Sequence, residues 1–215
     1  MKPRSSRTGE RLLVRLGVIW AIAVVIGLCM LFQYQTTAGV IGKPVERWPA
    51  GSRVVPAEGR AHLVMVAHPR CPCTRASINA LARIMAHAQD RATATVLFLR
   101  PKSAAIGWEQ TDLWRSAAAI PGVQVVCDDG GNEATRFGVE SSGHVLLYDR
   151  NGWQRFSGGI TAGRGHFGDN AGLDHCIAFI DGRKTDRHDT PVFGCSLREP
   201  MVGDVRGAGL CRKTK

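Results

Sequence analysis

Aromatic residues and glycine-rich nucleotide motifs are scarce here, and their scarcity excludes two functional classes. Aromatic side chains make up 7% of the 215 residues, and none of the basic segments interleaves them as surfaces for single-stranded nucleic acids do. The net charge of +10 lies largely in the first fifteen residues and in the tail, so we expect no nucleic-acid partner. No GxGxxG follows an apolar run at the spacing of a dinucleotide site, and nothing demands an organic cofactor.

Charge is absent from a long apolar run, Leu16–Tyr34. A helix needs about 20 such residues to cross a bilayer, so we expect residues 16–34 to be a transmembrane anchor. Basic residues precede the run, which predicts a cytoplasmic segment 1–15 and an extracytoplasmic remainder. A cleaved signal peptide is the alternative, although residues 36–38 make a poor cleavage site.

The remainder alternates short apolar runs with helical patterns. We predict strands at 62–68, 92–100, 123–129, 143–149 and 152–160, and helices at 74–89, 109–120, 131–139 and 169–182. This order predicts an α/β/α sandwich with a mixed central sheet over residues 61–182. Residues 35–60 are expected to be a linker and residues 183–215 a basic tail, disordered after Ser196.

Two cysteines stand one proline apart between the first strand and its helix, in "AHPRCPCTRAS". A helix N-terminus favours the thiolate form, and Arg70 and His68 would add positive charge. Pro72 fixes the backbone between Cys71 and Cys73, and Thr74 is expected to cap the helix. This pattern indicates thiol–disulfide exchange in which one cysteine attacks and the other resolves.

Four segments together resemble the thioredoxin superfamily, and within it the RedB-type, membrane-anchored proteins of bacteria. They are "HPRCPCTRAS", "SSGHVLLYDRNG", "FSGGITAGRGHFGDNAG" and "VFGCSL". The resemblance implies a thioredoxin-like fold and a soluble domain in the periplasm, held at the inner membrane by residues 16–34. It also implies a protein thiol or disulfide as substrate or redox partner.

The sequence departs from the superfamily pattern at two places. The usual Cys-x-x-Cys is Cys-Pro-Cys here, so Cys71 and Cys73 cannot both occupy the two family positions. The cis-proline that faces the family's cysteines is replaced by Gly143. We expect Gly143 to leave space beside the thiols, which would favour metal entry and alter substrate docking. A module that has lost its chemistry is a further alternative.

The pairing of the other cysteines stays open at this point. Cys71 or Cys73 could instead be stapled to Cys127, Cys176 or Cys195, and a Cys176–Cys195 bridge is plausible. Cys211 lies in the basic tail. All of these would face an oxidising compartment if the anchor is oriented as expected.

A copper chaperone is the principal alternative to redox exchange. Soft thiolates and imidazole favour Cu(I), and Sco-type chaperones use two cysteines with a distant histidine. Here the set would be Cys71, Cys73 and His166, with His68 and His144 as other candidates. The threonine that precedes the reactive cysteine of thioredoxin-fold peroxidases is absent.

The glycine-rich stretch 158–172 is the other unusual feature. It can be a long turn in which Asp169 or Asn170 caps the last helix. It can also lie over the cysteines, where Arg164 or His166 would steer a thiolate or an anionic substrate.

Overall fold

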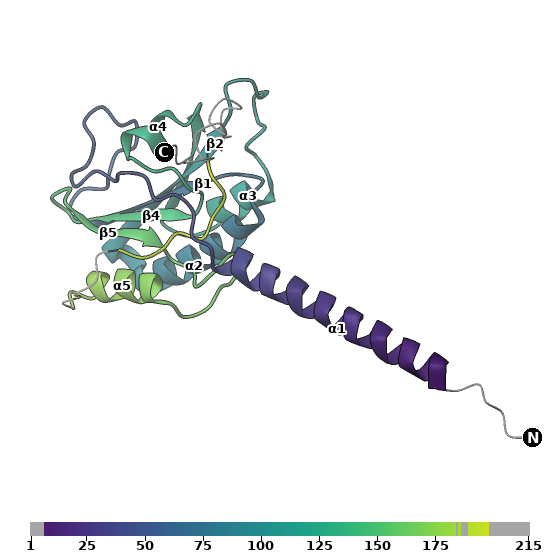
Figure 1. Ribbon diagram of the computed structural model, residues 1–215. Helices are drawn as coiled ribbons and strands as arrows, with labels where there is room; N and C mark the ends of the chain where they lie inside the picture. Colours follow the sequence, from purple (N-terminus) through teal and green to yellow (C-terminus); the bar gives the residue numbers. More distant parts are fainter. Residues whose placement is uncertain (1–6, 184, 186–188, 198–215) are drawn as a thin grey trace, which may run out of the picture. The chain divides into compact units, whose positions relative to one another are not determined.

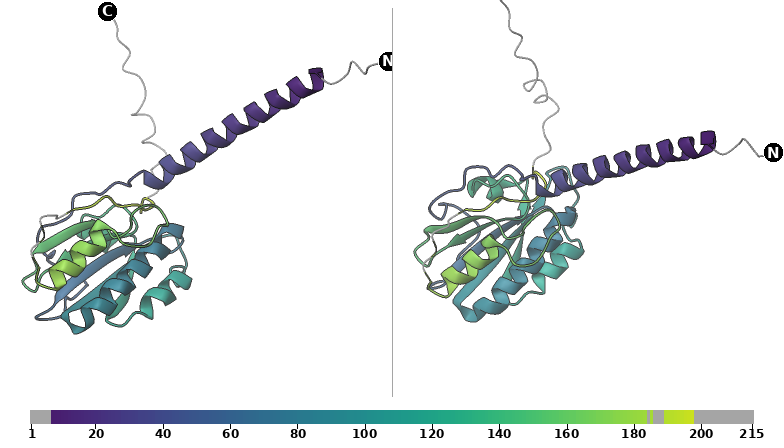
Figure 2. Two further views of the ribbon diagram at one scale, coloured as in Figure 1. Left: turned by 90° about the horizontal axis from the view of Figure 1, so that it is seen from below. Right: turned by 60° about the horizontal axis from the view of Figure 1, so that its bottom comes forward.

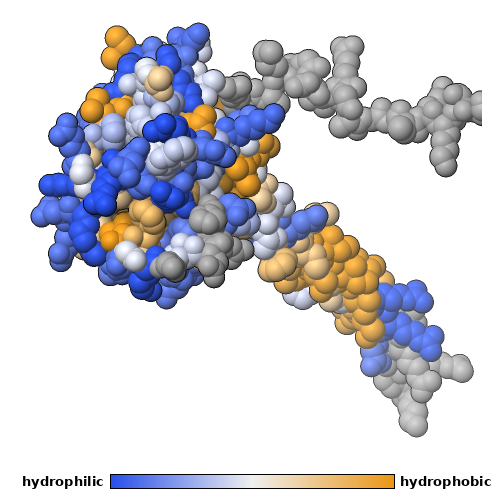
Figure 3. Space-filling view, turned by 90° about the vertical axis from the view of Figure 1, so that its left-hand side faces the viewer, coloured by the Kyte–Doolittle hydropathy of each residue, from blue (hydrophilic) through white to orange (hydrophobic). Residues whose placement is uncertain are grey.

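The computed structural model describes residues 7–183, 185 and 189–197, and the chain forms two compact units, Met1–Thr37 and Ala38–Lys215. The first unit is one helix, α1 (Arg7–Thr36). Its segment Gly9–Thr36 is long and apolar enough to cross a membrane. Figure 3 shows apolar side chains covering most of this helix and hydrophilic ones at its N-terminal end. The charge-free run Leu16–Tyr34 lies wholly within α1.

The second unit contains five strands and the helices between them (Figure 1). The predicted order of strands and helices is confirmed, with ends that move by a few residues. The elements are β1 (Ala61–Ala67), α2 (Pro72–Ala88), a 3-10 turn (Gln89–Arg91), β2 (Ala92–Arg100), α3 (Asp112–Ala118), β3 (Val123–Asp129), α4 (Asn132–Arg136), β4 (His144–Tyr148), β5 (Gln154–Gly159) and α5 (Ala171–Ile180).

The strands form one mixed sheet in the order β3-β2-β1-β4-β5. β1, β2 and β3 are parallel, and β4 runs antiparallel to both β1 and β5. Helices α2, α3 and α5 lie side by side on one face, with α2 in the middle, and α4 lies on the other (Figures 1 and 2). The unit is therefore a thioredoxin-like α/β/α sandwich, as the sequence predicts.

Each face of the sheet has its own apolar core. The face under α2, α3 and α5 buries alternate residues of the strands, among them Leu63, Phe98 and Phe156, against Leu81 and Ile84 of α2. The other face buries residues such as Val64, Leu97, Phe137 and Tyr148. Because strand side chains alternate between faces, the continuous apolar runs of β1 and β2 supply both cores. Each fully buried leucine or phenylalanine stabilises the fold by about 1.5–3 kcal/mol.

Irregular chain covers much of the α4 face. The segment expected to be a linker packs here from residue 38 onward, with Trp48 against Phe137 and Tyr148 and the Tyr148 hydroxyl donating to the Val45 carbonyl at 3.1 Å. The Gly39 N–H donates to the Val192 carbonyl at 2.8 Å, which joins this segment to the C-terminal one.

The described part of the expected tail is also packed. Residues 189–197 start beside β5, where Asp189 pairs with Ser157, and Val192 is fully buried. The expected disorder after Ser196, and Cys211 with it, falls outside the described residues apart from Leu197, which is buried.

Three connections meet at one edge of the sheet because of its topology. β1 and β5 are parallel to each other through β4, so their C-terminal ends and the N-terminal end of β4 share this edge. The connections are residues 68–71 after β1, residues 140–143 before β4 and residues 160–170 after β5. Apart from His144, which begins β4, every residue of the predicted site lies on one of these connections or in the first turn of α2.

Candidate functional site: a three-cysteine cluster

Cys71 is the residue that precedes the first turn of α2. The helix begins at Pro72, whose fixed φ suits the first helical position, and Cys71 has the extended backbone of an N-cap. The prediction that Thr74 caps the helix was therefore wrong, because Thr74 is already inside the first turn. The cap residue is the cysteine itself, so its sulfur lies at the positive end of a 17-residue helix.

A second sulfur comes from a distant part of the chain. The Sγ atoms of Cys71 and Cys195 lie 3.0 Å apart, although the residues are 124 positions apart in the sequence. The plausible Cys176–Cys195 bridge is contradicted, since Cys176 is fully buried in the apolar core under α5. The sequence analysis does not count Cys195 among the site residues, but one of its open alternatives pairs Cys71 or Cys73 with Cys195, and the contact with Cys71 agrees with that alternative.

Ser142 joins the connections that hold the cluster together. Its hydroxyl accepts from the His68 N–H at 2.8 Å and lies 2.8 Å from the Thr74 hydroxyl. Its own N–H donates to the Cys195 carbonyl at 2.8 Å. One buried serine thus fixes the end of β1, the first turn of α2 and the segment that carries Cys195. This residue was not singled out from the sequence.

Gly143 does not leave open space beside the thiols, contrary to expectation. Its φ of +82° is in the left-handed region, and a Cβ there would come within 2.7 Å of the Ser77 hydroxyl. Its N–H donates to the Val66 carbonyl at 2.7 Å, which continues the pairing of β1 with β4. No peptide bond within the described ranges is cis. Gly143 serves the backbone rather than a ligand.

The three thiols have different proton affinities. Burial alone would raise the pKa of Cys71, but hydrogen bonding to Cys195 and Thr74 outweighs it and lowers that pKa below its ordinary value. Burial and the neighbouring Cys71 raise the pKa of Cys73. Burial and the hydrogen bond to Cys71 raise the pKa of Cys195 to about 12. Cys71 is therefore the thiol of the cluster whose pKa is lowered rather than raised.

Arg164 reaches the cluster from the glycine-rich stretch, as one of the two interpretations of that stretch predicts. Its guanidinium donates to the Gly194 carbonyl at 3.0 Å, and its charge and hydrogen bonding favour the thiolate of Cys73. Asn170 caps α5 by accepting from the N–H groups of Gly172 and Leu173, so the capping interpretation also holds. His166 lies exposed in a turn closed by its N–H and the Gly163 carbonyl.

His68 and Arg70 form one side of the site with Trp108. The His68 ring meets the Trp108 ring edge to face at 5.7 Å, and the Arg70 guanidinium lies 4.6 Å from the centre of the same ring. The His68 Nδ1 accepts from the Arg70 N–H at 3.2 Å. Pro72, which separates Cys71 from Cys73 in the chain, is exposed. These groups shape the approach to the sulfurs.

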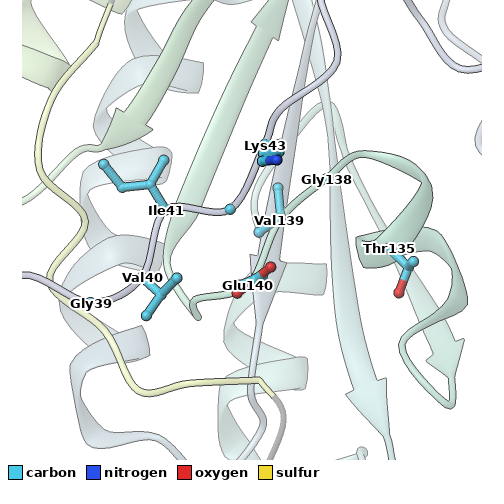
Figure 4. Close-up of a pocket in the computed structure, with 9 residues that line it drawn as sticks. Gly39, Val40, Ile41, Lys43, Thr135, Gly138, Val139 and Glu140 are labelled. Atoms are coloured by element: carbon cyan, nitrogen blue, oxygen red, sulfur yellow. The ribbon is translucent and has the colours of Figure 1, made fainter. Parts of the chain in front are cut away.

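Among the described residues, no group of three or more histidine, cysteine, aspartate or glutamate side chains has the arrangement of a metal site. A cavity of about 690 Å³ lies between residues 39–43 and residues 135–140, lined by Val40, Ile41, Val139 and Glu140 (Figure 4). The cysteines do not line this cavity. Its residue Glu140 accepts, through the main-chain carbonyl, from the N–H of Leu197 at 2.9 Å, and Leu197 lies two residues beyond Cys195.

Comparison with known structures supports the fold. A hypothetical protein from Sinorhizobium meliloti superposes with a TM-score of 0.55 and 19% identity, covering 76% of this chain and 96% of its own. An uncharacterized conserved protein from Geobacillus kaustophilus gives 0.55 and 14%, covering 77% and 93%. A secreted disulfide oxidoreductase of Mycobacterium tuberculosis gives 0.40 and 16%, covering 58% and 83%.

The two likenesses with a TM-score of 0.55 concern the fold alone. No family model matches the sequence, and no curated protein matches it.

Proposed function

We propose that this chain is a membrane-anchored thiol–disulfide oxidoreductase of the RedB type, working on the periplasmic side of a bacterial inner membrane. The observation that carries the proposal is the Cys71 sulfur, which lies at the N-terminus of α2 with a lowered pKa and a second sulfur 3.0 Å away. A stabilised thiolate in contact with another thiol is the arrangement that dithiol exchange requires.

The chemistry follows from the order of proton affinities. The thiol with the lowest pKa is the best leaving group, and it also has the largest fraction of thiolate at neutral pH. Cys71 fills that role, and Cys73, two residues along, is the second cysteine of the sequence motif. The substrate is a protein thiol or disulfide, and the exchange needs neither a metal nor an organic cofactor.

The place of action follows from the composition of α1. The helix spans the length of a bilayer core, and basic residues precede it. The positive-inside rule then puts Ala38–Lys215 outside the cytoplasm, where disulfides persist. A domain held at that surface would exchange with envelope proteins.

The test uses the full chain in detergent with a fluorescent peptide that carries two cysteines. We expect the parent to interconvert the peptide's dithiol and disulfide, and Cys71→Ser to lose at least about 100-fold of the rate, because the thiolate is lost. Cys127→Ser is the matched control, since Cys127 lies outside the cluster. Equal rates for Cys71→Ser and the parent would refute the proposal.

Copper delivery through Cys71, Cys73 and His166 is the competing proposal. Its support is the softness of two neighbouring thiols. The described residues form no three-ligand group, and His166 is exposed in its turn, so redox exchange is favoured. Metal analysis of the purified chain separates the two: about one copper per chain, lost on Cys71→Ser and on His166→Ala, would favour delivery.

A further inference from the structure

We infer that Cys195, rather than Cys73, is the redox partner of Cys71, and that substrate thiols exchange at the Cys195 sulfur. The inference rests on the proposed function and assigns its second cysteine. Its geometric basis is the 3.0 Å contact between the two Sγ atoms, one from the start of α2 and one from the C-terminal segment 189–197.

The C-terminal segment is held in place by a series of hydrogen bonds. At one end, the Thr190 hydroxyl donates to the Gly159 carbonyl at 2.7 Å. At the other end, the Leu197 N–H donates to the main-chain carbonyl of Glu140. Between them the Cys195 carbonyl accepts from Ser142, and the Gly194 carbonyl accepts from Arg164. Hydrogen bonds therefore fix the segment on both sides of Cys195, and they hold its sulfur next to that of Cys71.

Gly194 shows how closely this segment approaches the sheet edge. A Cβ at this position would lie 1.7 Å from the Ser142 carbonyl oxygen and 2.8 Å from its carbon. Only glycine can occupy the site without moving the segment away. The residue immediately before Cys195 must therefore be glycine, because the segment passes close to Ser142, whose hydroxyl also contacts Thr74.

Cys73 is less suited to pairing with Cys71. Cys73 also lies beside Cys71, and hydrogen bonding to Cys71 contributes to its raised pKa, so contact alone does not choose between Cys73 and Cys195. A Cys71–Cys73 bond would close a very small, strained ring, whereas Cys195 comes from a separate segment and its Sγ already lies 3.0 Å from that of Cys71. Arg164 favours the Cys73 thiolate, which makes Cys73 an accessory thiol.

Exposure decides which sulfur meets the substrate. Cys71 is 2% exposed, whereas Cys195 is partly exposed. In the oxidised protein a substrate thiolate would attack the Cys195 Sγ, the Cys71–Cys195 bond would break, and its electron pair would remain on Cys71 as the thiolate. Thr74 and the end of α2 are in place to stabilise that leaving group.

The second step completes a two-electron exchange. The substrate's other thiolate attacks its own sulfur in the mixed disulfide, releasing Cys195, which takes up a proton. The substrate dithiol has become a disulfide, and the protein disulfide has become a dithiol. A disulfide-bearing partner protein restores the Cys71–Cys195 bond by the same exchange in reverse.

Peptide mapping tests the assignment directly. The full chain in detergent is oxidised with oxidised glutathione, blocked with N-ethylmaleimide and digested with trypsin. The sequence releases "CPCTR" (71–75) and "HDTPVFGCSLR" (188–198) as separate peptides. We expect a cross-linked pair of these two. A "CPCTR" peptide two hydrogens lighter, with unpaired 188–198, would overturn the inference while leaving the proposed function intact.

Variants then assign the two ends of the bond and its role. Cys73→Ser should retain the cross-link and keep the peptide-oxidation rate within about fivefold, whereas Cys71→Ser should lose the cross-link. Cys195→Ser should lose at least about 50-fold of that rate, with Cys127→Ser unchanged. Circular dichroism checks that each variant is folded. An unchanged rate in Cys195→Ser would overturn the inference, and absent peptide oxidation by the parent would refute the proposed function instead.

Discussion

Two regions of the second unit hold the same side chain in opposite settings. At the edge of the sheet, Cys71 sits at a helix N-terminus among hydrogen-bond donors, and its pKa is lowered. In the core under α5, Cys176 has only apolar neighbours, and burial raises its pKa far above the ordinary range. Both thiols are almost fully buried, so burial does not set reactivity. The donors that surround the sulfur do.

The largest expected contrast is between the serine variants of these two cysteines. Cys71→Ser should abolish exchange, by at least about 100-fold, without lowering stability much. Cys176→Ser should leave the exchange rate near that of the parent but cost about 1–3 kcal/mol of unfolding free energy, because a hydroxyl is buried without a partner. Parallel rate and denaturant measurements check this. Equal loss of rate in both would break the comparison.

Alkylation against pH separates the thiols next. Only the thiolate reacts, so a lowered pKa makes a thiol react at lower pH, and a raised one delays reaction to higher pH. In the reduced protein Cys71 should therefore react at a pH below that of an ordinary thiol, Cys127 only near its pKa of about 11, and Cys195 only near 12. Mass spectrometry of quenched samples gives each midpoint. A Cys71 midpoint above that of Cys127 would contradict the electrostatic account.

Gly194→Ala should displace the C-terminal segment that carries Cys195 and so weaken its contact with Cys71. The added Cβ would collide with the Ser142 carbonyl, so the C-terminal segment must shift, at a cost of about 1–3 kcal/mol. We expect the yield of the Cys71–Cys195 cross-link to fall several-fold. Gly27→Ala is the control, because Gly27 has helical backbone in α1 and a Cβ there meets no atom within 4 Å. An unchanged yield would show that the segment does not position Cys195.

Arg164→Gln should have the smallest effect. The variant loses the charge that favours the Cys73 thiolate, so the Cys73 pKa should rise further and its alkylation slow by a few-fold at a fixed pH. The hydrogen bond to Gly194 is worth about 1 kcal/mol, so stability should fall only slightly. Arg183→Gln, three residues after the end of α5, is the matched control. Faster alkylation of Cys73 in this variant would contradict the stabilisation of the Cys73 thiolate by Arg164.

The strands and the Cys71 region were predictable because their signals are local. A largely apolar run predicts β2 at Ala92–Arg100, and a shorter stretch rich in valine predicts β3 at Val123–Asp129, and both ranges agree with the structure. The junction of β1 with α2 was likewise evident from "AHPRCPCTRAS". The start of α2 was placed two residues late because Thr74 was taken as the cap, whereas Pro72 is compatible with the first turn.

The rest of the site depends on contacts that no local pattern encodes. Cys195 and Ser142 belong to chain without helical or strand periodicity, and their positions follow from single hydrogen bonds and one glycine contact. The packing of residues 38–60 escaped prediction for the same reason. Gly143 was matched to a family position, but the atom that fills its space, the Ser77 hydroxyl, comes from a helix seen in sequence only as an apolar stripe.

The separation of Cys71 and Cys195 along the chain has a thermodynamic consequence. The two cysteines are 124 positions apart, so a bond between them would place β2, β3, β4 and β5 within one covalent loop and leave β1 outside it. Closing a loop of roughly that length removes about 4–5 kcal/mol of conformational entropy from the unfolded chain in the simplest model. Each turnover would thus convert the domain between a form that contains this covalent loop and a form that lacks it. By linkage, the free energy by which the bond stabilises the native fold equals the free energy by which folding favours the disulfide over the dithiol.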